Sequence, residues 1–403
     1  MTTKETPFAQ RLNIFSLILL ALCLFQCSQD SNTLKIEKGS RIFLVGNNLP
    51  SRMMNYGHFE TEMHLRYPDS TLYIRNMGDG GNTPGFRPHS GRNTPWAFPG
   101  AEQFQTELAK NSESEGHLET EDEWLKRLQA DIILAFFGYN ESFEGPEGLE
   151  NYKGELEAFI HHTFRQKYNG DTTQLAIVSP IAFEDLSDRY DLPNGDKENE
   201  NLALYTAAMK EIAERNNVLF VDAFNPSKDW YASSSEPLTI DGFQLNEEGY
   251  KKFAVFLADR VFGEDKVRAG EHRELVHAAV KEKNWMWHND FKIPNGVHVF
   301  GRRYDPFGPD NYPAEIQKIR EMTDIRDQAI WKAVKGEKMD VRVADEKTTP
   351  LPSVETNLKY DEKNPPRYLY GEEALSTIKV SEGYKIELFA SEEEFEDLAN
   401  PVQ

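Results

Sequence analysis

The chain has 403 residues, with 45 lysines and arginines against 67 aspartates and glutamates, and its formal net charge at pH 7 is −22. A surface this acidic repels phosphate backbones, which argues against nucleic-acid binding. Hydrophobic residues make up 39% of the chain, enough for a packed core, so the composition argues against global disorder.

The first 34 residues predict export. Lys4 and Arg11 precede an apolar run over residues 12–25 that is too short to span a bilayer comfortably. The four residues that end at Cys27 resemble a bacterial lipobox, although Gln26 departs from the small residue usual before that cysteine. We therefore expect a signal peptide with lipobox over residues 1–27, with Cys27 as the lipid anchor, and a tether over residues 28–34. The protein would be an exported lipoprotein of the cell envelope, periplasmic or attached to the outer membrane; plain secretion and an uncleaved anchor are the alternatives.

Five apolar segments predict buried parallel strands: residues 41–45, 71–75, 131–137, 174–179 and 217–222. Helical patterns alternate with them, over residues 101–110, 121–129, 149–166, 199–215 and 247–261. Strands that alternate with helices in this way favour right-handed βαβ units and a doubly wound sheet. The sequence thus predicts an α/β domain over residues 35–262, a three-layer sandwich around a parallel five-stranded sheet.

The character of the chain changes after this domain. Residues 263–336 predict a helical appendage, with two charged helices over 264–283 and 312–335. The loop predicted between them carries aromatic residues that either pack the appendage or stack on a sugar: Trp285, Trp287, Phe291 and Tyr304. Residues 337–370 are polar and read as a linker. Residues 371–403 contain strand-like stretches at 376–380 and 384–389, and we expect the start of a truncated β module there.

Four polar clusters follow predicted strands or open a predicted helix. They are Gly46-Asn47-Asn48-Leu49, the run from Asn76 to Thr83, Gly138-Tyr139-Asn140-Glu141, and the run from Asp241 to Leu245. The carboxyl ends of parallel strands meet at one edge of the sheet, which is where ligands bind in such folds. In this order the clusters resemble the sequence blocks of the SGNH (GDSL-type) hydrolases, over about residues 35–261. The resemblance implies a flavodoxin-like parallel sheet.

The resemblance also implies a role for each position. Asn48 stands at the position of the family's serine nucleophile, and Gln244 at the position of its histidine base. Asp241 matches the carboxylate that orients the base, and Gly81 and Asn140 match donors of the oxyanion hole. Neither amide can ionise or shuttle a proton near neutral pH. Losing the serine or the histidine costs a working triad roughly a million-fold in turnover.

Three functions remain open on these residues. The first is an altered SGNH-like domain that binds a carbohydrate or acyl ligand through Asn48, Gly81, Asn140 and Gln244, with Asp241 and Glu141 as acceptors. The second is an active GDSL-type esterase or acylhydrolase, for example a polysaccharide deacetylase, that uses a relocated nucleophile such as Ser51 with His58 or His64. The third is an assembly domain.

Each cluster also has a purely structural interpretation. The glycines between Gly78 and Gly81 suit a tight turn, Asn140 suits a helix N-cap, and Asp241 suits a turn cap. His161 and His162 lie on adjacent helix faces, a poor geometry for a metal, so we expect neither a metal nor a cofactor.

The end of the chain resembles the opening of the β-propeller module in large planctomycete-type (PVC) haem-binding proteins, which often carry an SGNH-like domain in front. This resemblance implies a possible downstream propeller or haem-binding module in a longer protein.

Overall fold

The computed structural model describes residues 33–89, 91–110, 116–264, 271–293, 299–301, 304–353, 363, 367–391 and 393. The chain divides into two compact units at Leu351 and Pro352, so the predicted domain and the helical appendage belong to the same unit. The predicted lipid anchor, Cys27, and the rest of residues 1–32 lie outside the described residues.

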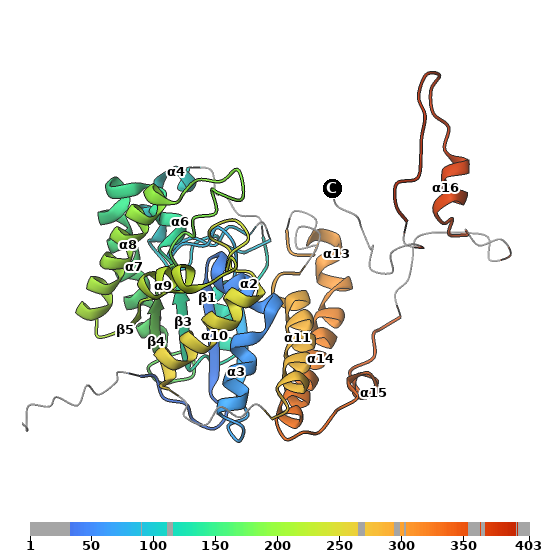
Figure 1. Ribbon diagram of the computed structural model, residues 1–403. Coiled ribbons are helices and arrows are strands. Elements are labelled where there is room, and N and C mark those ends of the chain that lie inside the picture. The colour runs from blue at the N-terminus through green and yellow to red at the C-terminus, as the bar shows by residue number, and fades with distance from the viewer. Residues whose placement is uncertain are drawn as a thin grey trace, which may run out of the picture. The chain divides into compact units, whose positions relative to one another are not determined.

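The first unit is built on one sheet of five parallel strands (Figure 1). The strands are β1 (Arg41–Gly46), β2 (Tyr73–Gly78), β3 (Ile132–Phe136), β4 (Gln174–Val178) and β5 (Leu219–Val221). Their order, β2-β1-β3-β4-β5, is the flavodoxin-like order. All five predicted strands are confirmed, and β2 begins and ends two to three residues later than predicted.

Helices cover both faces of the sheet, which confirms the three-layer sandwich. They are α2 (Asn48–Tyr56), α3 (His58–Arg66), η1 (Ala101–Phe104), α4 (Thr106–Ala109), α5 (Glu121–Arg127), α6 (Tyr139–Ser142), α7 (Gly145–Gln166), α8 (Asp196–Arg215), α9 (Phe224–Ser233) and α10 (Glu247–Phe262). A hydrophobic core lies on each face of the sheet, and alternate residues of β1 point into one core or the other. Phe43 and Val45 pack with α5, α7 and α8, whereas Ile42 and Leu44 pack with α2, α3 and α10. The helix predicted over 101–110 is two short pieces, because the chain breaks at Gln105.

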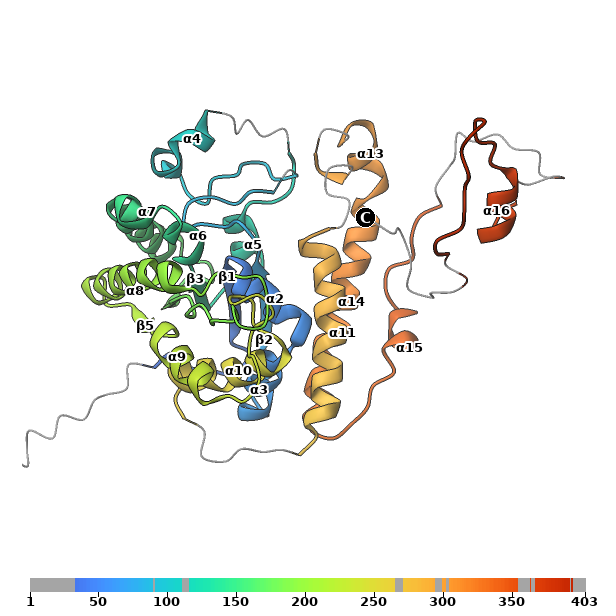
Figure 2. The ribbon, with the colours of Figure 1, turned by 45° about the horizontal axis from the view of Figure 1, so that its top comes forward.

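The appendage is a helical hairpin that lies beside the edge strand β2 (Figure 2). It contains α11 (Arg273–Phe291), α13 (Tyr304–Asn311) and α14 (Pro313–Ala333). The outward carbonyls of β2 and the residue before it accept hydrogen bonds from its side chains: Trp331 Nε1 donates to Leu72 O (3.0 Å), Lys283 Nζ to Ile74 O (3.0 Å) and Trp287 Nε1 to Asn76 O (2.6 Å). An edge strand with unpaired backbone groups invites pairing with another chain, and these donors cover that edge.

The first appendage helix differs from its prediction. It begins at Arg273 and continues to Phe291, through residues that we expected in a loop. Trp287 and Phe291 explain the extension, because they lie one turn apart and both pack edge-on against the buried Trp124. These two aromatic residues therefore pack the appendage, whereas Trp285 is 63% exposed.

Residues predicted as linker and β module also differ. A short helix, α15 (Val341–Asp345), lies in the linker range, and Arg326 of α14 holds Asp345 by two hydrogen bonds of 3.0 and 3.1 Å. In the second unit, α16 (Gly371–Thr377) takes up the start of the first predicted strand. Residues 378–391 form no strand, since no described segment pairs with them. Across the described ranges, every helix is too short or too polar to cross a lipid bilayer.

Candidate functional site

Asn48 lies where β1 turns into α2. Gly46 is required at this turn, because its φ is +129° and a Cβ there would lie 2.1 Å from Phe136 O. The buried Asn47 caps α2 by accepting a hydrogen bond from Leu49 N (3.2 Å). Asn48 is therefore the first residue of α2, half-buried at the carboxyl edge of the sheet. Within the described residues its side chain makes no hydrogen bond and its N–H has no acceptor.

The second cluster folds back onto the end of β1. Asn82 is buried and donates through Nδ2 to Gly46 O (3.0 Å), and Asp79 N donates to the same oxygen (2.9 Å). Gly81 lies between them with a φ of +82° and is exposed. In the described part of the chain nothing accepts a hydrogen bond from Gly81 N–H. This N–H is free to bind a ligand oxygen.

The third cluster joins the second. Asn140, on the short helix α6 after β3, donates through Nδ2 to Asn82 O (2.9 Å). One N–H of the Asn140 amide is used in this way, and the other has no acceptor among the described residues. Tyr139 stacks on Phe243 with ring centroids 3.3 Å apart, so the third cluster also touches the fourth.

The fourth cluster pairs the carboxylate of Asp241 with the amide of Gln244. Gln244 Nε2 donates to Asp241 Oδ2 (2.8 Å), while Phe243 N (3.0 Å) and Gln244 N (2.6 Å) donate to Oδ1. The turn is fixed by Gly242, whose φ is +88° and whose position leaves no room for a Cβ beside Phe183. Asp241 therefore caps the turn, as its structural interpretation required, and also orients the Gln244 side chain.

The structure brings the predicted site residues to one edge of the sheet. Gly81 and Asn140 belong to clusters joined by a hydrogen bond, and Asp241 and Gln244 form a pair. A hydrogen bond of 3.0 Å from Tyr250 to Leu49 O ties the helix after Gln244 to the helix that begins at Asn48. Within the described residues, no hydrogen bond joins the side chain of Asn48 to that of Gln244.

Among the described residues, no hydrogen bond joins Ser51 to His58 or His64. Ser51 is 9% exposed, and its Oγ accepts a hydrogen bond from Lys292 Nζ (2.7 Å), which also pairs with Asp79 (3.1 Å). His58 instead stacks on His277 with centroids 4.6 Å apart, and burial, followed by the field of His277, lowers the pKa of His58 to about 4. The buried His64 faces Glu60, 3.6 Å from Oε1.

Sequence reasoning missed two cations near this edge. Arg52 follows Asn48 by four residues, and that helical spacing was a usable signal. Lys292 reaches Ser51 across 241 residues of sequence, and nothing local in the sequence indicates this contact.

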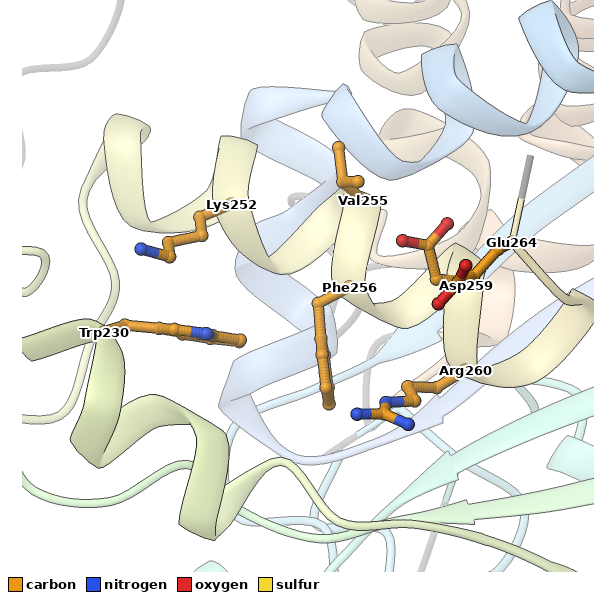
Figure 3. Close-up of a pocket in the computed structure, with 7 residues that line it drawn as sticks. All are labelled: Trp230, Lys252, Val255, Phe256, Asp259, Arg260 and Glu264. Atoms are coloured by element: carbon orange, nitrogen blue, oxygen red, sulfur yellow. The ribbon is translucent and has the colours of Figure 1, made fainter. Parts of the chain in front are cut away.

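Three cavities lined by described residues contain no residue of the four clusters. One of about 430 Å³ lies between α9 and α10, where Lys252 and Phe256 surround Trp230 (Figure 3). A larger one of about 1000 Å³ follows β5, and a third of about 500 Å³ contains His58 and His277. Within the described residues no group of three or more histidine, cysteine, aspartate or glutamate side chains is placed to hold a metal ion.

Glu141, next to Asn140, is buried with an unusual carboxyl. Its Oε2 accepts from Gly138 N (2.7 Å) and so caps α6, while Oε1 has no partner among the described residues. Burial, and then the carboxylate of Glu155, raise the pKa of Glu141 to about 8. Tyr152, Tyr205 and Arg87 are ionisable side chains near this pair.

We expect a pH-dependent contribution of Glu141 to stability. Below about pH 4.5 the Glu141 carboxyl is protonated in both the folded and the unfolded chain, so its contribution to stability is fully present. Between about pH 4.5 and 8 the carboxyl loses its proton in the unfolded chain but keeps it in the folded chain. The free energy of unfolding therefore falls as the pH rises through this range. Glu141→Gln mimics the neutral carboxyl and should remove this fall, on the order of a few kcal/mol. Urea titrations of both proteins at pH 5, 6, 7 and 8 measure the difference. Parallel profiles for the two proteins would show that Glu141 is ionised in the fold.

Comparison with known proteins connects this geometry to a family. Residues 76–252 match the sequence model of the GDSL-like Lipase/Acylhydrolase family, a range that contains the second, third and fourth clusters. No curated protein sequence matches the chain.

Several solved structures are similar to this chain. A gut microbial diltiazem-metabolizing enzyme is 16% identical, with 57% of this chain and 48% of that chain covered and a TM-score of 0.40. A protein described as a GDSL-like lipase from Parabacteroides merdae is 16% identical, with 57% and 98% covered and a TM-score of 0.41. A catalytic mutant of an acetylxylan esterase from Geobacillus stearothermophilus is 15% identical, with 59% and 100% covered and a TM-score of 0.39. Likeness at this level does not extend to substrate or mechanism.

The range matched by the family model, the order of the clusters and the parallel sheet agree with one another. Over residues 76–252 the chain is therefore similar in sequence to the GDSL-like lipase/acylhydrolase (SGNH) family, and its parallel sheet has the topology of the SGNH fold.

Proposed function

We propose that this SGNH-like domain binds a carbohydrate or acyl ligand at the family's site and does not form an acyl-enzyme. The observation that carries the proposal is the 2.8 Å hydrogen bond from Gln244 Nε2 to Asp241 Oδ2. In a working triad the histidine donates one ring N–H to the aspartate and takes the serine proton with its other nitrogen. Gln244 keeps the first task and cannot perform the second, because an amide oxygen does not accept a proton near neutral pH.

The nucleophile position supports the same proposal. Asn48 offers a carboxamide, which has no ionisable proton near neutral pH and is a poor nucleophile. The donors that bind the oxyanion in the family have counterparts here: Asn48 N–H, Gly81 N–H and the side-chain amide of Asn140. Among the described residues, both backbone N–H groups and the second N–H of the Asn140 amide have no acceptor. Donors of this kind suit the oxygens of hydroxyl, acetyl and acetamido groups.

The alternative, an esterase with Ser51 as nucleophile, has less support. A general base must accept the hydroxyl proton, whereas Lys292 donates to Ser51 Oγ and is paired with the carboxylate of Asp79. The hydroxyl is also buried on α2 beneath the appendage.

The test uses the full chain and two readouts. Wild-type protein is assayed on p-nitrophenyl acetate and on acetylated xylo-oligosaccharides, and we expect no turnover above the uncatalysed rate. Binding of N-acetylglucosamine and of the same oligosaccharides is measured by ligand-observed NMR. Asn140→Ala should weaken binding on the order of tenfold, since a hydrogen bond to the ligand is lost.

Asn151→Ala is the matched control, because Asn151 is an exposed asparagine whose Nδ2 donates to Phe104 O, away from the clusters. Equal affinities for Asn140→Ala and wild type would contradict the proposed site. Wild-type turnover that disappears in Ser51→Ala would establish the hydrolase in its place.

A further inference from the structure

Arg52 is a cation without a carboxylate partner. Within the described residues no aspartate or glutamate oxygen lies within ion-pair distance of its guanidinium, which donates to Tyr56 Oη (3.2 Å). Its Nε is buried and has no hydrogen-bond partner. The chain has a net charge of −22, and two nearby cations are paired, Arg66 with Glu62 and Lys292 with Asp79. Among the described residues, Arg52 has no such pair, and nor does Arg260 of α10.

Arg52 faces the same way as Asn48. The two residues are four apart on α2, and side chains at this spacing lie on one face of a helix. Asn48 is at the first turn and Arg52 at the next, so the guanidinium extends the row of donors that begins at the carboxyl edge of the sheet.

Tyr250 connects Arg52 to the fourth cluster. Its hydroxyl donates to Leu49 O (3.0 Å), and its ring stacks on Tyr56, the hydrogen-bond partner of Arg52, with centroids 4.7 Å apart. Burial raises the pKa of the Tyr250 phenol, the charge of Arg52 and a hydrogen bond with its side chain lower it, and the charge of Asp241 raises it. The guanidinium thus lies near this hydroxyl. Asp241 accepts hydrogen bonds from backbone and side-chain amides and, among the described residues, forms no ion pair with Arg52.

We propose that the site takes an anionic ligand, a sugar or acyl compound that carries a carboxylate or a sulfate group, and that Arg52 binds that group. This inference rests on the proposed function and names its ligand class. The planar guanidinium presents two parallel N–H groups that match the oxygens of carboxylate and sulfate.

The experiment measures binding of three small sugars to the full chain by ligand-observed NMR: glucose, glucuronate and glucose 6-sulfate. Small probes are chosen because a net charge of −22 repels polyanions. We expect at least one of the two anions to bind more tightly than glucose, with a preference that weakens as salt is added. Arg52→Gln should lower affinity for that anion about ten- to a hundredfold and leave affinity for glucose unchanged.

Two further variants keep the test decisive. Arg52→Lys keeps the positive charge but lacks the two parallel N–H groups of the guanidinium, so it should lose part of the preference for the anionic sugar over glucose. Arg260→Gln is the matched control, because Arg260 also lacks a carboxylate partner among the described residues and lies over the ring of Phe256 in the cavity of Figure 3. It should bind all three sugars as wild type does.

The outcomes separate the inference from the proposed function. Equal affinities for glucose and both anions, an unchanged anion preference in Arg52→Gln, or no measurable binding of either anion would each overturn the inference. None of these results affects the Asn140→Ala comparison with acetylated ligands, which decides the proposed function by itself. A preference for glucuronate over the sulfate, or the reverse, identifies which anion the site takes.

Discussion

Asn48→Ser combined with Gln244→His is expected to hydrolyse p-nitrophenyl acetate at least about a hundredfold faster than wild type, since a positioned general base contributes 10²- to 10⁴-fold. The double variant supplies the two groups that the proposed site lacks. A histidine at position 244 finds Asp241 Oδ2, which now accepts from Gln244 Nε2 at 2.8 Å. Position 48 is the first residue of α2, so a serine there would lie at the N-terminus of that helix. Its own backbone N–H and that of Gly81 have no acceptor among the described residues.

The single variants are the controls for this gain of activity. Serine without a base and histidine without a nucleophile should each stay near the wild-type rate, because the triad acts as a unit. Adding Asp241→Asn to the double variant should remove most of the gain, since an amide at 241 no longer fixes the imidazole. A double variant as silent as wild type would mean that the two side chains do not reach each other, and the site would then have lost more than two functional groups.

The sheet could be predicted from sequence because its signal is local. Each strand is a short apolar run bounded by turn residues, and both cores follow from the alternation along β1. The boundary of β2 was the least accurate. Its apolar pattern ends at Arg75, yet the strand continues to Gly78, since Asn76 pairs with Leu44 and its carbonyl accepts from Trp287. That donor comes from the appendage, 211 residues away.

The same distinction applies to the site. Asp241 and Gln244 are three residues apart, so a turn alone brings them together, and the resemblance to the last SGNH block was what pointed to this pair. Asn140 and Asn82 meet because two strands end side by side, which the fold class implies. The long helix α11 and the contact of Lys292 with Ser51 depend on tertiary packing, and propensity along the chain carries no information about them.

Asp327→Ala should lower the free energy of unfolding by about 3–5 kcal/mol, the usual cost of breaking a buried ion pair by removing one partner. Asp327 on α14 is 1% exposed and binds Arg75 of β2 through two hydrogen bonds of 3.0 and 2.5 Å. Without it the guanidinium remains buried beside Trp287 with one backbone acceptor, Ile74 O (3.1 Å). Urea denaturation followed by tryptophan fluorescence measures the loss.

Asp324→Ala is the matched control, because Asp324 lies on the same face of α14, 3.9 Å from the same guanidinium, and its side chain is 69% exposed. An exposed pair contributes about 0–1 kcal/mol, so this variant should be close to wild type. The difference between the two losses of unfolding free energy shows whether the appendage is an integral part of the fold. If Asp327→Ala cost no more than Asp324→Ala, the hairpin would be a loosely attached addition. A large difference means that the charge on β2 requires α14, and that the sheet edge leading to Gly78 and the second cluster is stable only with the hairpin in place.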